Sequence, residues 1–283
     1  MDTFSWKKID QLDPEDIRDS RFQLHQAIQN VAAIGRKFLP HSDGDENAVL
    51  TWVPGLKRMA GKWVVGDKSF RSSISFDSFS IFLVDEKVFT ISQFKLEGKT
   101  HSQLMIWLEE QIGKLGLDAR NLTMNLPYGL PEYDTQSGEP FHLANPRAAG
   151  ELGKYYHNAY ITLREIKQKM KKSGEINIWP HHFDIALDVI IKDTGDSETD
   201  TKISFGMSPG DQHYQNPYFY VNCWPHADTQ KLDKLSNNAI WVSEDWTGAV
   251  LHSKNLFEGP SQKKILDLFY HEASSQLIET LTK

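Results

Sequence analysis

The side chains that could do chemistry gather between Ile178 and His226. This stretch contains three segments, IWPHHFDIALDVII, SFGMSPGDQHY and NPYFYVNCWPH, which combine histidines, carboxylates and aromatic residues with the apolar alternation of strands. Tyrosine and tryptophan beside a carboxylate and an imidazole can orient a small polar ligand. No nucleotide-binding loop, HExxH helix or nucleophile elbow accompanies them. The sequence therefore indicates the place of a site but no particular reaction.

Strand alternation predicts which of these side chains share a face. Successive side chains of a strand point to opposite sides, so His182 and Asp184 would face away from the apolar Phe183 and Ile185. If the three strands pair as a meander, polar residues of the next two strands join them on one face of the sheet. Loops with proline and glycine, such as SPGD and QNPY, lie between the strands, and loops of this kind commonly hold ligands. We expect a binding pocket formed by His182, Asp184, Ser204, Asp211, His213, Tyr218, Tyr220, Asn222 and Glu244.

The leading hypothesis from these residues is a protein that binds a small polar molecule, with no cofactor assigned. Asp184, His182, Tyr218 and Tyr220 would contact that ligand. One alternative is a non-catalytic interaction or structural protein. A half-covered antiparallel sheet also carries polar residues on its solvated face, and such a face can equally meet another subunit.

A metal site is a further alternative at the same place. His182 and Asp184, two residues apart on a strand, could ligate one ion, and His213, Asp211 or Glu244 could complete the set of ligands. Two potential ligands at strand spacing often occur by chance, and no paired-histidine signature supports them. We therefore assign no metal ion.

A hydrolase without a metal would use the same histidine. Asp184 could hold His182 as a general base for Ser208 or Ser204. The segment SPGD is equally well explained as a β-turn, because proline at its second position and glycine at its third suit the backbone angles. Whether the protein is an enzyme stays open at this point.

Composition narrows the possible partners. The chain has 283 residues and a formal charge of -7, from 38 acidic and 31 basic residues, which disfavours a nucleic-acid partner. Arg58, Lys62 and Arg71 could reach an anionic ligand, but we interpret them as ordinary surface positions. The first residues lack the apolar core of a signal peptide, and no apolar run is long enough to span a bilayer. We expect a cytoplasmic protein without a membrane partner.

Periodicity predicts a mixed architecture. Helices are expected over residues 14 to 38, 100 to 115, 147 to 172 and 260 to 281, where apolar residues recur every three or four positions. Short β-rich runs occupy residues 48 to 96, and a second group follows Glu175, beginning with one strand from Glu175 to Ile191. The fold class is therefore α+β, with antiparallel or mixed sheets packed against helices.

A proline-rich stretch divides the predicted elements into two groups. Residues 127 to 146 contain four prolines and few apolar anchors, which is typical of a connection between two halves. We expect an N-terminal α+β lobe over residues 1 to 130 and a C-terminal α+β lobe over residues 140 to 283, which carries the candidate site. The two lobes are expected to form one compact unit.

The motifs WPHHFDIA, SFGMSPGDQHYQNPYFYVNCWP and EDWTGAVL resemble those of a family of bacterial proteins known as a domain of unknown function. The resemblance extends over most of the chain, with looser motifs in the first half. It implies no activity or cofactor, so it transfers no catalytic role to any residue. Phe183 and Asp184 fit the shared pattern, whereas some similar proteins have a small residue at the position of His182.

Overall fold

The computed structural model describes residues 3–120, 122–124, 126–196, 199–244, 246–259 and 261–282. Within these residues the chain has an α+β fold of four α-helices and two antiparallel sheets, which confirms the predicted fold class. The chain divides into two compact units. We call residues 12–153 and 178–183 the N-terminal unit, and residues 1–11, 154–177 and 184–283 the C-terminal unit.

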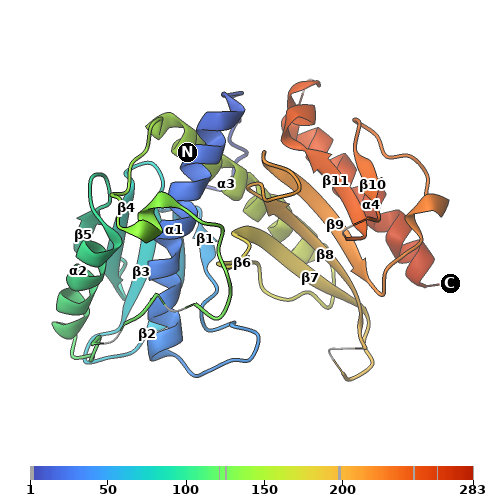
Figure 1. The fold of residues 1–283 in the computed structure, drawn as a ribbon. Coiled ribbons are helices and arrows are strands. Elements are labelled where there is room, and N and C mark those ends of the chain that lie inside the picture. The colour runs from blue at the N-terminus through green and yellow to red at the C-terminus, as the bar shows by residue number, and fades with distance from the viewer. Residues whose placement is uncertain are drawn as a thin grey trace. The chain divides into compact units, whose positions relative to one another are not determined.

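The N-terminal unit combines a five-stranded sheet with helices (Figure 1). Its strands follow one another in space in their order along the chain, β1-β2-β3-β4-β5, and each pair is antiparallel. The elements in chain order are α1 (Pro14–Phe38), β1 (Thr51–Val53), β2 (Arg58–Val64), β3 (Phe70–Ser75), β4 (Ser80–Asp85), β5 (Thr90–Lys95), α2 (His101–Gly113) and a short 3-10 helix, η1 (Asp134–Ser137).

Helix α1 begins and ends where the sequence predicts. The side chain of Asp13 accepts a hydrogen bond from the backbone N–H of Glu15 at 2.9 Å, and Pro14 occupies the first turn. The helix buries Leu24, Ile28 and other apolar residues and packs against β2 and β3. One face of the sheet is therefore covered by α1, as Figure 1 shows.

The C-terminal unit is built around the second sheet, whose strand order is β10-β11-β9-β8-β7-β6. Helix α3 (Pro146–Lys169) enters this unit at Lys154. The first strand of this sheet in chain order, β6 (Asn177–Trp179), extends into the N-terminal unit from residue 178 on. The remaining elements are β7 (Asp184–Lys192), β8 (Thr201–Ser208), β9 (Tyr218–Trp224), η2 (Thr229–Lys231), β10 (Ile240–Val242), β11 (Gly248–His252), η3 (Ser253–Phe257) and α4 (Gln262–Leu281).

Helices cover the apolar face of the second sheet. Helix α4 contacts β8, β9 and β11, and the ring of Tyr270 lies against Phe205 and Phe219. The hydroxyl of Tyr270 donates to the carbonyl oxygen of Gly206 at 2.9 Å. From the other helix, Tyr155 of α3 lies near Phe219. The opposite face of the sheet is thus left for polar side chains.

The single strand expected from Glu175 to Ile191 is interrupted by a turn. β6 ends at Trp179, residues 180–183 form a turn, and β7 begins only at Asp184. The turn is closed by a 2.7 Å hydrogen bond from the N–H of Phe183 to the carbonyl of Trp179. Phe183 adopts a φ of 58°, a conformation rare for an aromatic residue. The alternation expected for His182 therefore does not apply.

No helix among the described residues is long and apolar enough to cross a membrane.

Candidate functional site

The register of the second sheet brings most of the predicted polar residues to one face. Ser204 of β8 lies opposite Asp188 of β7 and Asn222 of β9. Tyr220 lies opposite Gly206, and Tyr218 lies opposite Ser208. Because side chains of paired positions share a face, these residues form one polar surface, which we call the C-terminal polar face.

Tyr220 and Asp184 are joined across the intervening strand. The hydroxyl of Tyr220 on β9 donates to a carboxylate oxygen of Asp184 on β7 at 2.5 Å. The tyrosine ring crosses β8 directly over Gly206, where a Cβ atom would overlap the end of the ring. Glycine is therefore required at this position, because any side chain would push Tyr220 away from Asp184.

A second tyrosine and aspartate pair lies at the next position along the face. The hydroxyl of Tyr218 donates to one carboxylate oxygen of Asp211 at 2.6 Å. The other oxygen of Asp211 accepts the backbone N–H groups of His213 and Tyr214 at 2.8 and 2.9 Å. Asp211 thus fixes the loop after the SPGD turn, and it holds that loop against β9.

Both tyrosines are held in the protonated form. Burial and the nearby Asp184 carboxylate raise the pKa of Tyr220 well above its ordinary value. Burial, followed by the hydrogen bond to Asp211, raises the pKa of Tyr218 in the same direction. At neutral pH each tyrosine is therefore a hydrogen-bond donor to a carboxylate, and neither is placed to act as a base.

Other predicted residues on this face are less closely joined. The hydroxyl of Ser204 donates to Asp188 at 2.6 Å, close to solvent. Asn222 lies opposite Ser204 on one side and opposite Gly248 of β11 on the other. Ser204, Asp188 and Asn222 form their own cross-strand row of the polar face, next to the row of Gly206 and Tyr220.

His182 belongs to the N-terminal unit, whereas Asp184 belongs to the C-terminal unit. The ring of His182 is exposed and lies 4.2 Å from that of His181, measured between ring centroids. In the same unit, His25 of α1 contacts the carbonyl oxygen of Pro180 at 2.8 Å. Burial lowers the pKa of His25 to about 4 and that of His181 to about 4. These two histidines are therefore neutral at physiological pH.

A cavity borders the C-terminal polar face. It has a volume of about 310 Å³, and its lining consists of His213, Tyr214, Trp241, Val242, Ser243, Glu244 and Trp246. Tyr214 lies edge-on to Tyr218, with ring centroids 5.1 Å apart, and Trp246 lies edge-on to Tyr220 at 6.2 Å. The cavity thus adjoins both tyrosine and aspartate pairs. Asp245, which lies between Glu244 and Trp246 in the sequence, is outside the described residues.

Three aromatic residues of this lining were not among the predicted site residues. Tyr214 comes from the loop after SPGD, Trp241 from β10 and Trp246 from the connection between β10 and β11. A signal for two of them was present, since Tyr214 and Trp246 stand in the QHY and EDWTGAVL motifs. Trp241 gave no comparable signal, because its place depends on the pairing of β10 with β11.

Two other cavities of the C-terminal unit have a different character. The larger, of about 540 Å³, lies where residues 6–11 meet the start of α4, and there the side chain of Gln262 bonds both backbone groups of Ile9. The other, of about 340 Å³, lies between α3 and α4, beside an ion pair of Lys263 with Glu165. The lining of neither cavity includes a residue of the two tyrosine and aspartate pairs.

The described residues include no group of three or more His, Cys, Asp or Glu side chains that could hold a metal ion. No protein-family model, curated protein or solved structure matches the chain. A function for this chain must therefore be inferred from the geometry of the site.

Proposed function

We propose that the protein binds a small polar ligand in the cavity beside the C-terminal polar face. The observation that carries this proposal is the lining itself, in which three aromatic rings stand with the Glu244 carboxylate and the His213 imidazole. Aromatic walls with a few polar groups are the usual composition of ligand sites, and about 310 Å³ lies at the small end of their range. A ligand the size of a single sugar or a small amine suits this volume.

The two tyrosine and aspartate pairs would act as the support of this cavity. Their hydroxyls already donate to carboxylates, so they hold the loop of Tyr214 and the ring of Trp246 in place. A ligand would instead meet Glu244 and His213, whose side chains are exposed. A carboxylate among ring faces favours a neutral or cationic molecule over an anion.

The motifs that resemble the bacterial family support the same place. SPGDQHY contributes Asp211, His213 and Tyr214, and EDWTGAVL contributes Glu244 and Trp246. We propose that the likeness reflects a shared binding site, and that the protein acts in the cytoplasm as a binding protein.

Thermal-shift screening tests this proposal. A panel of monosaccharides, small amines, nucleosides and carboxylic acids is added to the intact protein, because a ligand that binds only the folded state raises Tm. We expect a neutral or cationic member to stabilise the wild type, and Glu244→Ala and His213→Ala to lose that shift. Glu139→Ala removes an exposed carboxylate in the N-terminal unit and serves as the charge-matched control. A shift that persists in both cavity variants would contradict the proposal.

A further inference from the structure

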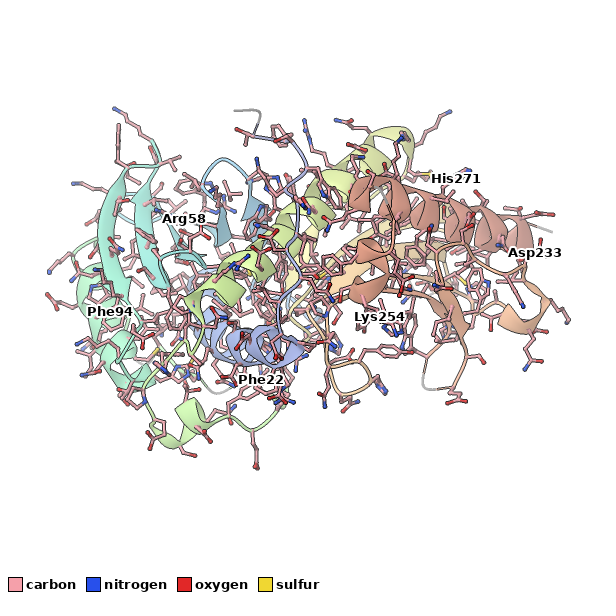
Figure 2. The ribbon with its side chains drawn as sticks, turned by 90° about the horizontal axis from the view of Figure 1, so that it is seen from above. Phe22, Arg58, Phe94, Asp233, Lys254 and His271 are labelled. Atoms are coloured by element: carbon pink, nitrogen blue, oxygen red, sulfur yellow. The ribbon has the colours of Figure 1, made fainter. Side chains whose placement is uncertain are left out.

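The face of the N-terminal sheet opposite α1 carries three aligned rows of side chains. In the first row Arg58, Ser75, Ser80 and Lys95 lie side by side on β2 to β5. The second row runs from Ala60 through Ser73 and Phe82 to Gln93, and the third contains Trp63, Arg71, Val84 and Thr90. We call this surface the outer face. Arg58 and Phe94, both labelled in Figure 2, belong to opposite faces of the sheet by this register.

Two arginine side chains of the outer face extend toward its central row. The guanidinium carbon of Arg58 lies 3.5 Å from the ring centroid of Phe82, which is the cross-strand partner of Ser73. In the third row, Nε of Arg71 donates to the carbonyl oxygen of Gly61. Gly61 follows Ala60, which is the cross-strand partner of Ser73 on β2. Arg58 therefore reaches the strand neighbour of Ser73 on β4, and Arg71 reaches β2 next to its strand neighbour there.

Neither arginine has a counter-charge in the part of the chain that the structure describes. Among the described residues, no carboxylate lies within ion-pair distance of Arg58 or Arg71, although both side chains are half-buried. Burial lowers the pKa of each of these guanidinium groups. A partly desolvated cation without an anion is unfavourable, and most proteins pair such groups.

Ser73 adds an unused hydrogen-bonding group at the same place. The residue is 1% exposed, and its hydroxyl has no hydrogen-bond partner among the described residues. A buried hydroxyl normally bonds to a protein group or to a bound molecule. In the register Ser73 lies between the rows of the two arginines, so a hydroxyl without a partner and two cations without a carboxylate, among the described residues, occur on the same face.

The surrounding charge is also positive. Residues 51 to 96 contain seven lysines and arginines against four acidic residues, although the whole chain has 31 basic and 38 acidic residues. The segment that forms this sheet is therefore basic, although the whole chain is acidic.

We propose that the outer face binds a phosphate or sulfate group, held by Arg58 and Arg71 as charged donors and by the hydroxyl of Ser73. The planar fork of a guanidinium group offers two parallel N–H donors, which match the oxygen atoms of such an anion. Arg58 and Arg71 are half-exposed, so their ends can turn to hold an anion above Ser73 while the strands keep their positions. This site is independent of the cavity in the C-terminal unit.

Titration calorimetry with sodium phosphate on the full chain tests the site, with sodium chloride and sodium acetate at equal ionic strength as comparisons. We expect phosphate and sulfate to bind and acetate to bind more weakly. Arg58→Gln and Arg71→Gln should each weaken phosphate binding about tenfold or more, because hydrogen bonds to charged groups are lost. Ser73→Ala should have a smaller effect of about threefold. Glycerol phosphate, tested in parallel, shows whether a phosphate group on a larger molecule is accepted.

Lys95→Gln is the matched control, since it removes the same charge from the same face in the first row. Arg58→Lys keeps the charge but removes the fork, so it should also weaken binding, and it serves if the glutamine variant unfolds. Equal binding of phosphate and chloride by the wild type would overturn the proposal, as would a loss in Lys95→Gln as large as in the arginine variants. Glu244→Ala should leave phosphate binding unchanged, which separates this site from the cavity.

Discussion

The polar faces of the two sheets differ in how their polar groups are satisfied. On the C-terminal polar face, Tyr220 donates to Asp184, Tyr218 donates to Asp211, and Ser204 donates to Asp188. On the outer face of the N-terminal sheet, the described residues supply no carboxylate to Arg58 or Arg71 and no hydrogen-bond partner to the hydroxyl of Ser73. The outer face has hydrogen bonds of its own, such as the one from Gln93 to Ser80, but among the described residues its two arginines have no carboxylate.

This difference distinguishes polar groups that stabilise the fold from polar groups that could bind a ligand. Polar groups that satisfy one another stabilise the fold and need no ligand, so on the C-terminal polar face the binding groups are expected beside the pairs, in the cavity. Polar groups that lack partners gain most from a ligand that supplies them. The type of a residue does not show whether it stabilises the fold or is available to a ligand. Its hydrogen-bond and ion-pair partners show this.

Gly206→Ala should cause the largest loss, because it breaks the closest pair on the C-terminal polar face. The added methyl would overlap the end of the Tyr220 ring and displace its hydroxyl from Asp184. We expect the free energy of unfolding to fall by about 2 to 3 kcal/mol, the cost of a lost hydrogen bond to a charged group with some overpacking. Urea unfolding followed by circular dichroism measures this change.

Gly174→Ala is the control for that substitution, since a methyl there would meet a backbone oxygen only at ordinary contact distance, 3.6 Å. The combination of Gly206→Ala with Tyr220→Phe should cost less than the sum of the single changes, because both act on one hydrogen bond. Additive costs would show that the Tyr220 and Asp184 pair is not what Gly206 protects.

High pH should lower the free energy of unfolding through the same tyrosine and aspartate pairs. The pKa of Tyr220 and that of Tyr218 are raised above the ordinary value of 10.0, so above pH 10 the unfolded chain loses protons that the folded protein retains. The stability present below pH 10 is therefore lost as pH rises toward the folded pKa values, by about 1.4 kcal/mol per pH unit for each such tyrosine. Urea unfolding between pH 8 and pH 11 measures the slope.

Tyr220→Phe should reduce this slope by the share of one tyrosine. Ultraviolet absorbance should show that the wild type ionises fewer tyrosines near pH 10.5 when folded than in urea. A slope unchanged by Tyr220→Phe would mean that this hydroxyl has the same pKa in both states, contrary to its place beside Asp184.

Arg58→Met should have the smallest effect on stability, and that effect sharpens the contrast between the two faces. Methionine keeps an apolar stem over Phe82 and removes a half-buried charge that has no carboxylate partner among the described residues. The lost cation–π contact and the removed desolvation cost oppose each other, so we expect a change within about 0.5 kcal/mol in buffer without phosphate. A loss of 2 kcal/mol or more, on the scale of the tyrosine and aspartate pairs, would remove the distinction between the faces. Urea unfolding of both proteins decides it.

Much of the fold was predictable from local patterns. Helix α1 runs from Pro14 to Phe38, as the Asp13 cap, the apolar spacing and the following Pro40 predict. α3 and α4 end or begin within a few residues of the predicted positions, because their apolar stripes are long. The five strands between residues 48 and 96 follow the alternation and turn signals of the sequence.

The candidate site was only partly predictable. Alternation correctly placed Ser204, Tyr218, Tyr220 and Asn222 on one face, because each lies inside a regular strand. It failed at His182, because the turn at residues 180–183 precedes the strand. Arg58 and Arg71 looked like ordinary surface residues, since nothing in their local sequence shows that the register places them in the rows on either side of the same serine.

The sequence by itself determined the helices, the strands and the face to which most side chains of each strand point, since these depend on neighbours a few residues away. The tertiary structure alone decided which hydroxyl meets which carboxylate, which glycine makes room for a ring, and which cations are left without an anion. Those outcomes depend on register between strands and on torsion angles such as that of Phe183, which are set when distant segments pack together.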